Sequence, residues 1–207
     1  MARHYGVSVR AYNISTEQLR FARARAAEQR LDHLVTFVED DYRNVTGRYD
    51  AFVSIGMLEH VGRREFASLA ATLSRTVDPA RGRGLLHFIG RDHPRRLNGW
   101  VRRRIFPGAY PPTLAEVTGR ILEPADMSVL HVENLRLHYA RTLTDWRTRF
   151  EGVEDAITSE FGAPFYRAWR LYLAGSEAAF RTGWMQLFQI VFAPAGGRAD
   201  GPRDAIL

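Results

Sequence analysis

The sequence contains no cysteine and no lysine. Without cysteine there can be no disulfide, no thiolate metal ligand and no cysteine nucleophile, and this composition suits a reducing cytoplasm. Because lysine is missing, every basic side chain is an arginine, and the formal net charge is still +6. That excess predicts an anionic partner, either nucleic acid or an anionic lipid surface. A bias in nucleotide composition would enrich arginine without any such function.

Long apolar runs are also missing. No stretch reaches 18 apolar residues, so we expect no transmembrane helix, and the first ten residues lack the apolar core of a signal peptide. The 207 residues, 45% of them hydrophobic and 12% aromatic, are enough for one globular domain with a full core. We therefore expect one domain over residues 1–193 and a disordered tail over 194–207, which is rich in Gly, Pro, Arg and Asp.

Strand and helix patterns alternate along the first 90 residues. Alternating or β-branched segments predict four strands, at 6–12, 35–38, 51–55 and 84–90. The segment Ser15-Thr16-Glu17-Gln18 has the form of a capping box and predicts a helix that runs to about Gln29. Apolar residues recur at helical spacing from Phe66 to Val77 and predict a second helix. This order predicts an α/β fold with a doubly wound, mostly parallel sheet.

The second half begins with a change in character. Residues 91–112 interleave arginines with Trp100, Ile105 and Phe106 and end in paired prolines, which indicates a lid-like insertion that extends to about residue 126. The remaining patterns predict a short helix, a bent strand, two helices and a last strand; they lie at 113–122, 127–137, 143–150, 161–180 and 187–192.

The most informative stretch is VSIGMLEHVG, from Val53 to Gly62. It begins in a buried strand, breaks at Gly56 and places Glu59 and His60 just beyond the carboxyl end of the strand, where ligands bind in open α/β sheets. A carboxylate and an imidazole there can orient a substrate, take a proton or hold an ion. The alternative is that Glu59 only caps the next helix and His60 lies in a solvated turn.

Six segments together resemble a known family. In chain order they read STEQ, IGMLEHVG, LLHFIG, IFPG, LRLHYARTLTDWRTRFE and FQIVF. In this order the chain resembles the cyclopropane-fatty-acyl-phospholipid synthases and the related mycolic acid cyclopropane synthases, from about Tyr5 to about Ala193. The resemblance implies the Rossmann-like sheet of a class I S-adenosylmethionine-dependent methyltransferase, with helices on both faces.

The resemblance also implies a reaction. The protein would transfer a methylene group from S-adenosylmethionine to a cis double bond of an unsaturated phospholipid acyl chain and so form a cyclopropane ring. In the family the base is a bicarbonate ion; by resemblance Glu59, His87 and Tyr139 hold it, with the backbone of Ile89, and no metal is expected. His87 and Tyr139 could equally be satisfied core residues.

For the cofactor, the resemblance points to Asn13, Ser15 and Gln18 after the first strand and to Ile55 on the third. Asp41, at the end of the second strand, is a further candidate on the adenine side. Family members usually carry threonine where Asn13 stands, and the capping box is a second role for Ser15 and Gln18.

The arginine-rich lid suits an anionic phospholipid surface, and a solvated basic loop is the alternative. We therefore expect a cytoplasmic protein in peripheral contact with the inner face of a membrane, with a homodimer left open. No nucleic-acid recognition motif is present, so nucleic acid is not expected as the partner.

The glycine-rich loop of the family is missing. Gly82-Arg83-Gly84 does not replace it, because this turn precedes a strand instead of joining a strand to a helix. We therefore expect an N-terminally truncated family member that lacks the first sheet strand, carries unpaired strand edges and binds S-adenosylmethionine poorly. Two further alternatives are a methyltransferase that makes a methyl-branched fatty acid and a non-catalytic remnant that binds lipid or a partner.

Overall fold

The computed structural model describes residues 1–197. Contacts divide the chain into two compact units, one at Met1–Arg48 and the other from Tyr49 onward. Residues 1–193, predicted to form a single domain, thus contain two compact units. The predicted tail begins too early, because Pro194 still pairs with Met127 and the Ala195 N–H donates to the Asp126 carbonyl at 2.8 Å. Residues 198–207 of that tail lie outside the described residues.

The first unit is a small parallel β-α-β arrangement. Its elements are α1 (Ala2–Tyr5), β1 (Val9–Asn13), α2 (Thr16–Glu28), β2 (Val35–Glu39) and the 3-10 turn η1 (Tyr42–Asn44). Strands β1 and β2 form a two-stranded parallel sheet in which Val9 lies opposite Val35. The predicted strands and helix of this unit are confirmed, because the β-branched alternation and the Ser15 N-cap act locally.

The second unit contains a four-stranded sheet in the order β3-β4-β6-β5. Its elements up to the sheet's second strand are β3 (Ala51–Ile55), α3 (Leu58–Val61), η2 (Arg63–Glu65), α4 (Phe66–Thr76) and β4 (Arg83–Gly90). The later elements are α5 (Gly99–Arg104), α6 (Leu114–Val117), η3 (Thr118–Leu122), β5 (Met127–Asn134), α7 (Arg136–Glu151), α8 (Glu154–Phe161), α9 (Ala163–Arg181) and β6 (Gln186–Pro194). Strands β3 and β4 form a parallel pair, and β6 is antiparallel to both of its neighbours, β4 and β5. This sheet is therefore mixed, whereas the sequence predicted a mostly parallel one.

Burial alternates along β4, as expected for a strand with one face on the core. Leu86 and Phe88 are fully buried, while His87 and Ile89 point to the opposite face and are half-buried. The apolar spacing predicted for α4 also holds, because Phe66, Leu69, Leu73 and Val77 are all buried.

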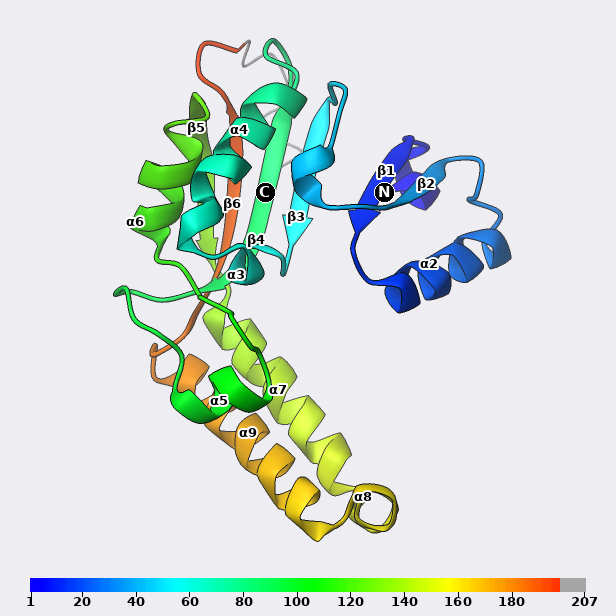
Figure 1. The fold of residues 1–207 in the computed structure, drawn as a ribbon, viewed down its shortest axis with the longest axis vertical. Coiled ribbons are helices and arrows are strands. Elements are labelled where there is room, and N and C mark those ends of the chain that lie inside the picture. The colour runs from blue at the N-terminus through cyan, green and yellow to red at the C-terminus, as the bar shows by residue number, and fades with distance from the viewer. Residues whose placement is uncertain (198–207) are drawn as a thin grey trace. The chain divides into compact units, whose positions relative to one another are not determined.

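Helices α7 and α9 pack against each other and extend away from the sheet in Figure 1. Their shared core meets β6 through a cluster of buried side chains: Ala140, Leu143, Leu173, Phe180 and Leu187. The strand predicted at 135–137 is wrong, because α7 begins at Arg136. There the Arg136 N–H donates to Asn134 Oδ1 at 3.1 Å, and its guanidinium donates to the carbonyls of Phe180 and Arg181.

Within residues 1–197 no helix combines the length and the apolar character needed to cross a bilayer.

Candidate active site

The site begins where β3 ends. Gly56 has φ of +64°, a left-handed conformation that glycine adopts without strain, and its N–H donates to the His87 carbonyl at 2.9 Å. The chain then enters α3, which carries Glu59 and His60. The break that the sequence places at Gly56 thus brings Glu59 to the carboxyl ends of the parallel pair β3 and β4.

Glu59 is a buried carboxyl group, 7% exposed. Its Oε1 accepts a hydrogen bond of 2.6 Å from the Ile89 N–H, and its Oε2 has no hydrogen-bond partner among the described residues. Burial raises the pKa of Glu59; the Ile89 N–H and the nearby His60 and His87 oppose this shift. Glu59 can therefore carry a proton more readily than an exposed glutamate, and the side chain does more than cap α3.

Tyr139 approaches the same place from α7. Its ring packs edge-to-face on Phe180, with 4.7 Å between the ring centroids. Burial raises the pKa of the Tyr139 hydroxyl, and Tyr172 and Glu59 raise it further. Since Ile89 packs on the same cluster as Tyr139, the structure brings Glu59, His87, Ile89 and Tyr139 into one region.

Two aromatic residues beside this region were not among the site residues predicted from the sequence. The Phe106 ring from the lid lies 6.0 Å from His60 and 6.4 Å from Tyr172 of α9, measured between ring centroids. Burial also raises the pKa of Tyr172. Their aromatic character is visible in the sequence, but the contact joins segments far apart in the chain, so no local pattern could have predicted it.

These groups suit a small oxyanion. The partnerless Glu59 Oε2 can donate when it is protonated, and the Tyr139 hydroxyl stays protonated and makes no hydrogen bond within residues 1–197. The Ile89 N–H is engaged by Glu59, so its observed role is to position the carboxyl group. No cluster of three or more His, Cys, Asp or Glu side chains that could hold a metal ion occurs in the described part of the chain.

The candidate cofactor residues of the first unit form a network of their own after β1. The Ser15 N–H donates to Asn13 Oδ1 at 2.8 Å, and Asn13 Nδ2 donates to Gln18 Oε1 at 2.8 Å. The Gln18 N–H donates to Ser15 Oγ at 3.4 Å, so the predicted N-cap is confirmed, whereas Asn13 takes the bond that a capping box would assign to Gln18. The Ser15 hydroxyl and the Gln18 amide N–H groups remain as donors for a ligand.

Asp41 caps η1 and is held by a neighbour. Its carboxylate accepts hydrogen bonds from the backbone N–H and the guanidinium of Arg43, which lowers the pKa of Asp41 to about 2. These bonds leave Asp41 less free for a ligand than the sequence predicted. Ile55 lies on β3, at the edge of the sheet in the second unit, and is 68% exposed.

Comparison with known proteins identifies relatives of this fold and sequence. The model of the mycolic acid cyclopropane synthetase family matches residues 1–190. Tuberculostearic acid methyltransferase UfaA1 of Mycobacterium tuberculosis is 36% identical over 190 residues, which are 89% of this chain and 44% of the relative. The cyclopropane-fatty-acyl-phospholipid synthase of Escherichia coli K12 is 33% identical over 194 residues, which are 93% of this chain and 49% of the relative. The chain thus spans about half the length of these curated relatives.

Among solved structures, mycolic acid cyclopropane synthase CmaA1, complexed with SAH and CTAB, superposes with a TM-score of 0.83 at 23% identity. The match covers 92% of this chain and 71% of that protein. The predicted α/β fold of the class I methyltransferases is therefore confirmed.

Proposed function

Because the chain belongs to the mycolic acid cyclopropane synthetase family, we propose that it acts as an S-adenosylmethionine-dependent enzyme on unsaturated acyl chains. Its reaction would transfer a methylene group to a cis double bond of a phospholipid acyl chain and form a cyclopropane ring. The observation that carries this proposal is the buried Glu59, whose Oε2 has no partner within residues 1–197 and whose surroundings include His87 and Tyr139.

Each of these residues has a task that follows from its surroundings. The Ile89 N–H fixes the orientation of the Glu59 carboxyl group, and burial keeps that group able to hold a proton. Tyr139 keeps its hydroxyl proton and so acts as a hydrogen-bond donor. Hydrogen-bond donors hold an anion better than a charged carboxylate alone could, because like charges repel.

Two groups from outside the chain complete the proposal. Bound bicarbonate would supply the base that takes a proton from the transferred methyl group, and Glu59, His87 and Tyr139 would hold it. S-adenosylmethionine would supply that methyl group, with Asn13, Ser15, Gln18, Asp41 and Ile55 as its proposed contacts. The related CmaA1 structure contains SAH, which supports this choice of cofactor.

We place the lipid partner at the lid. Helix α5 carries Arg102, Arg103 and Arg104, and Trp100 and Phe106 beside them are each 39% exposed. Exposed aromatic rings interleaved with guanidinium groups are typical of proteins that lie on an anionic membrane surface. The proposed contact is peripheral, at the cytoplasmic face.

The test is turnover by the purified 207-residue chain. It is incubated with labelled S-adenosylmethionine, bicarbonate and vesicles that contain a cis-unsaturated phospholipid, and the lipid products are examined by mass spectrometry. Because the sequence predicts weak binding of S-adenosylmethionine, labelled cyclopropane lipid is expected from the unaltered chain when this cofactor is supplied at high concentration. Tyr139→Phe should reduce its rate by about 10-fold or more, while Tyr5→Phe, at a side chain that is 76% exposed, should not. Vesicle binding without any labelled product would contradict the proposal and favour a non-catalytic lipid-binding protein.

The name of the relative from M. tuberculosis supports a second candidate, a methyltransferase that makes a methyl-branched fatty acid. Both reactions begin with attack of the double bond on a methyl group, and they differ in how the resulting carbocation loses a proton. Mild hydrogenation separates the products before mass analysis: an alkene takes up two hydrogens, whereas a cyclopropane ring keeps its mass.

A further inference from the structure

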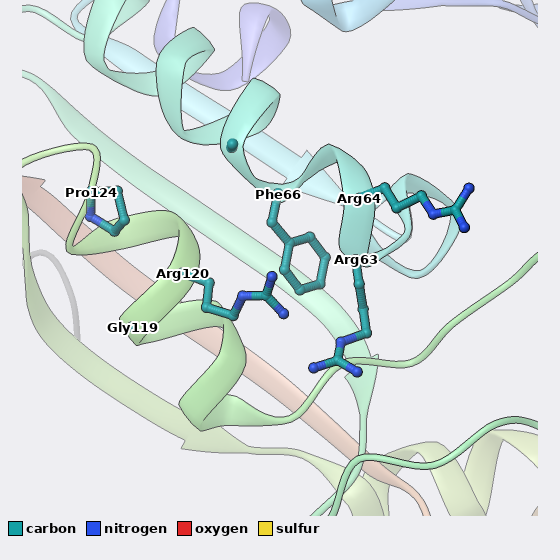
Figure 2. Close-up of a pocket in the computed structure, with 7 residues that line it drawn as sticks. Arg63, Arg64, Phe66, Gly119, Arg120 and Pro124 are labelled. Atoms are coloured by element: carbon teal, nitrogen blue, oxygen red, sulfur yellow. The ribbon is translucent and has the colours of Figure 1, made fainter.

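Two hollows beside the candidate active site are lined by arginines. The first, of about 680 Å³, lies between η2, the start of α4 and η3 and is shown in Figure 2. The second, of about 520 Å³, lies between the residues around η2 and the lid. Together they carry five arginines, which are called the arginine surface below: Arg63, Arg64, Arg96, Arg102 and Arg120.

The positive charge of this surface is only partly neutralised. Arg63 is 2.9 Å from Glu116, a buried glutamate that also accepts hydrogen bonds from the Tyr110 hydroxyl. Arg120 lies over the Phe66 ring at 5.6 Å, and Figure 2 shows the Arg120 side chain extending toward this ring. Within residues 1–197 neither Arg64 nor Arg120 makes an ion pair. Glu65 also lines the second hollow and Arg63 is paired with Glu116, so the arginines without an ion pair are the ones suited to bind phosphate in a planar fork.

The arginine surface adjoins the candidate active site. Val61, the last residue of α3, and Gly62 line the second hollow, and Glu59 lies on the same short helix. Tyr110, which also lines it, donates its N–H to the Glu59 carbonyl at 2.8 Å. A phosphate bound here would therefore be held close to Glu59.

We propose that the arginine surface binds the phosphates of anionic phospholipid head groups in a bilayer and so favours anionic lipids over zwitterionic ones. The inference deepens the proposed function and rests on it for the acyl chemistry. It adds residues outside the lid, Arg63, Arg64 and Arg120, to the membrane contact. A phospholipid fits better than a nucleic acid because exposed Trp100 and Phe106 accompany the arginines and because the surface adjoins the acyl site.

The test compares matched pairs of arginines in the full chain, with vesicle cosedimentation as the readout. Vesicles contain either equal parts of phosphatidylglycerol and phosphatidylcholine or phosphatidylcholine alone. Arg64→Gln with Arg120→Gln should weaken binding to the anionic vesicles by roughly 10- to 30-fold. The control, Arg141→Gln with Arg149→Gln, removes two exposed arginines of α7 that also lack an ion pair within the described residues, and should weaken binding by less than about threefold.

The charge-preserving pair, Arg64→Lys with Arg120→Lys, guards against misfolding and should retain most of the binding. Equal losses in the surface and control pairs would overturn the inference, because binding would then follow net charge alone. Equal binding to both vesicle types would overturn it as well. The chain could instead bind a short DNA duplex more tightly than it binds the vesicles. If that binding depended on Arg64 and Arg120, the partner of the arginine surface would be nucleic acid and not lipid.

Turnover separates this inference from the proposed function. Arginine-dependent vesicle binding without any product would support the inference and contradict the proposed enzymatic function. Equal turnover rates on anionic and zwitterionic lipid, in both the unaltered chain and the Gln pair, would support the proposed enzymatic function and contradict the inference.

Discussion

Glu59 differs from the other acidic residues that the structure describes because it is buried and one of its carboxyl oxygens has no hydrogen-bond partner there. A buried carboxyl group without a cation partner destabilises the folded state in its charged form. Such a cost is common at sites where a group must exchange a proton or hold an anion. Ile89, His87 and Tyr139 surround Glu59 from two different elements, so its setting depends on the whole second unit.

The stability of the protein should depend on this one carboxyl group. Because the pKa of Glu59 is raised above its usual value of 4.5, the folded state binds the proton more tightly than the unfolded state. The free energy of unfolding therefore falls as the pH rises above that value. Glu59→Gln cannot ionise, so we expect its stability advantage over the unaltered chain to grow between about pH 4 and pH 7.5 while turnover is lost. Urea unfolding at several pH values measures this.

The matched control for that series is Glu160→Gln, which changes an exposed carboxylate of α8. Its difference from the unaltered chain should not change over the same pH range. If Glu59→Gln gave the same pH-independent offset as Glu160→Gln, the burial of Glu59 would have no energetic consequence.

Asp41 shows the opposite behaviour, since its pKa is lowered to about 2 by Arg43. The Asp41–Arg43 pair stabilises the folded state at pH values above the usual Asp pKa of 3.8. This stabilisation is lost as the pH falls from 3.8 toward 2. Arg43→Gln removes the guanidinium, so we expect the Asp41 pKa to return toward 3.8. An NMR titration of the side-chain carboxyl carbon measures it, and an Asp41 pKa that stays near 2 would contradict the assignment.

At the scale of elements, β4 determines the geometry of the site. One face of this strand enters the core through Leu86 and Phe88, and the other presents His87 and Ile89 toward the site. Its parallel neighbour β3 brings α3 to the same edge, and its antiparallel neighbour β6 connects it to the core of α7 and α9. A one-residue shift of β4 would reverse both faces, so the packing of β4 and the site depend on each other.

Gly84 tests how tightly β4 is packed, and Gly175 in α9 is the comparison at an open position. A Cβ at Gly84 would overlap the ring of Phe192 on β6, so Gly84→Ala should lower the free energy of unfolding by about 1–3 kcal/mol. Gly175 lies in the interior of α9, where a Cβ would meet no atom within 4 Å. Gly175→Ala should raise the free energy of unfolding by about 0.5–1 kcal/mol, because alanine loses less backbone entropy. Thermal unfolding of both variants tests the pair, and effects of the same sign would contradict it.

At the scale of the molecule, the two units differ in how much apolar core they contain. Within Met1–Arg48 the buried apolar residues are Ala2, Leu19, Ala26 and Val45, whereas the second unit buries rings and branched side chains along β4 and β6. A two-stranded sheet with one covering helix is marginally stable. We expect the units to open independently.

Hydrogen exchange measures this difference. Backbone amides of β1 and α2 should exchange about 10-fold or more faster than those of β4 at Leu86 and Phe88, because local opening exposes the smaller unit at lower cost. Uniform protection across both units would show a single cooperative structure. S-adenosylmethionine should slow exchange in β1 and α2 if Asn13, Ser15 and Gln18 contact it.

Local chemistry in the sequence was sufficient for several parts of this protein. The N-cap at Ser15, the break at Gly56 and the alternation along β4 each depend on neighbours a few residues away, and each predicts its element correctly. The order of the motifs was enough to identify the family, because related chains keep both the residues and their sequence order. Glu59 could be singled out for the same reason.

The tertiary structure alone decided the rest. At the start of α7 the Arg136 guanidinium donates to carbonyls at the end of α9, a contact that no local pattern contains. The hydrogen bond from Ile89 to Glu59 and the approach of Phe106 to Tyr172 join distant segments in the same way. The placement of Arg120 beside Arg63 likewise comes from packing between η3 and α4. Periodicity reports which face of an element is buried, but only packing determines which other element covers that face.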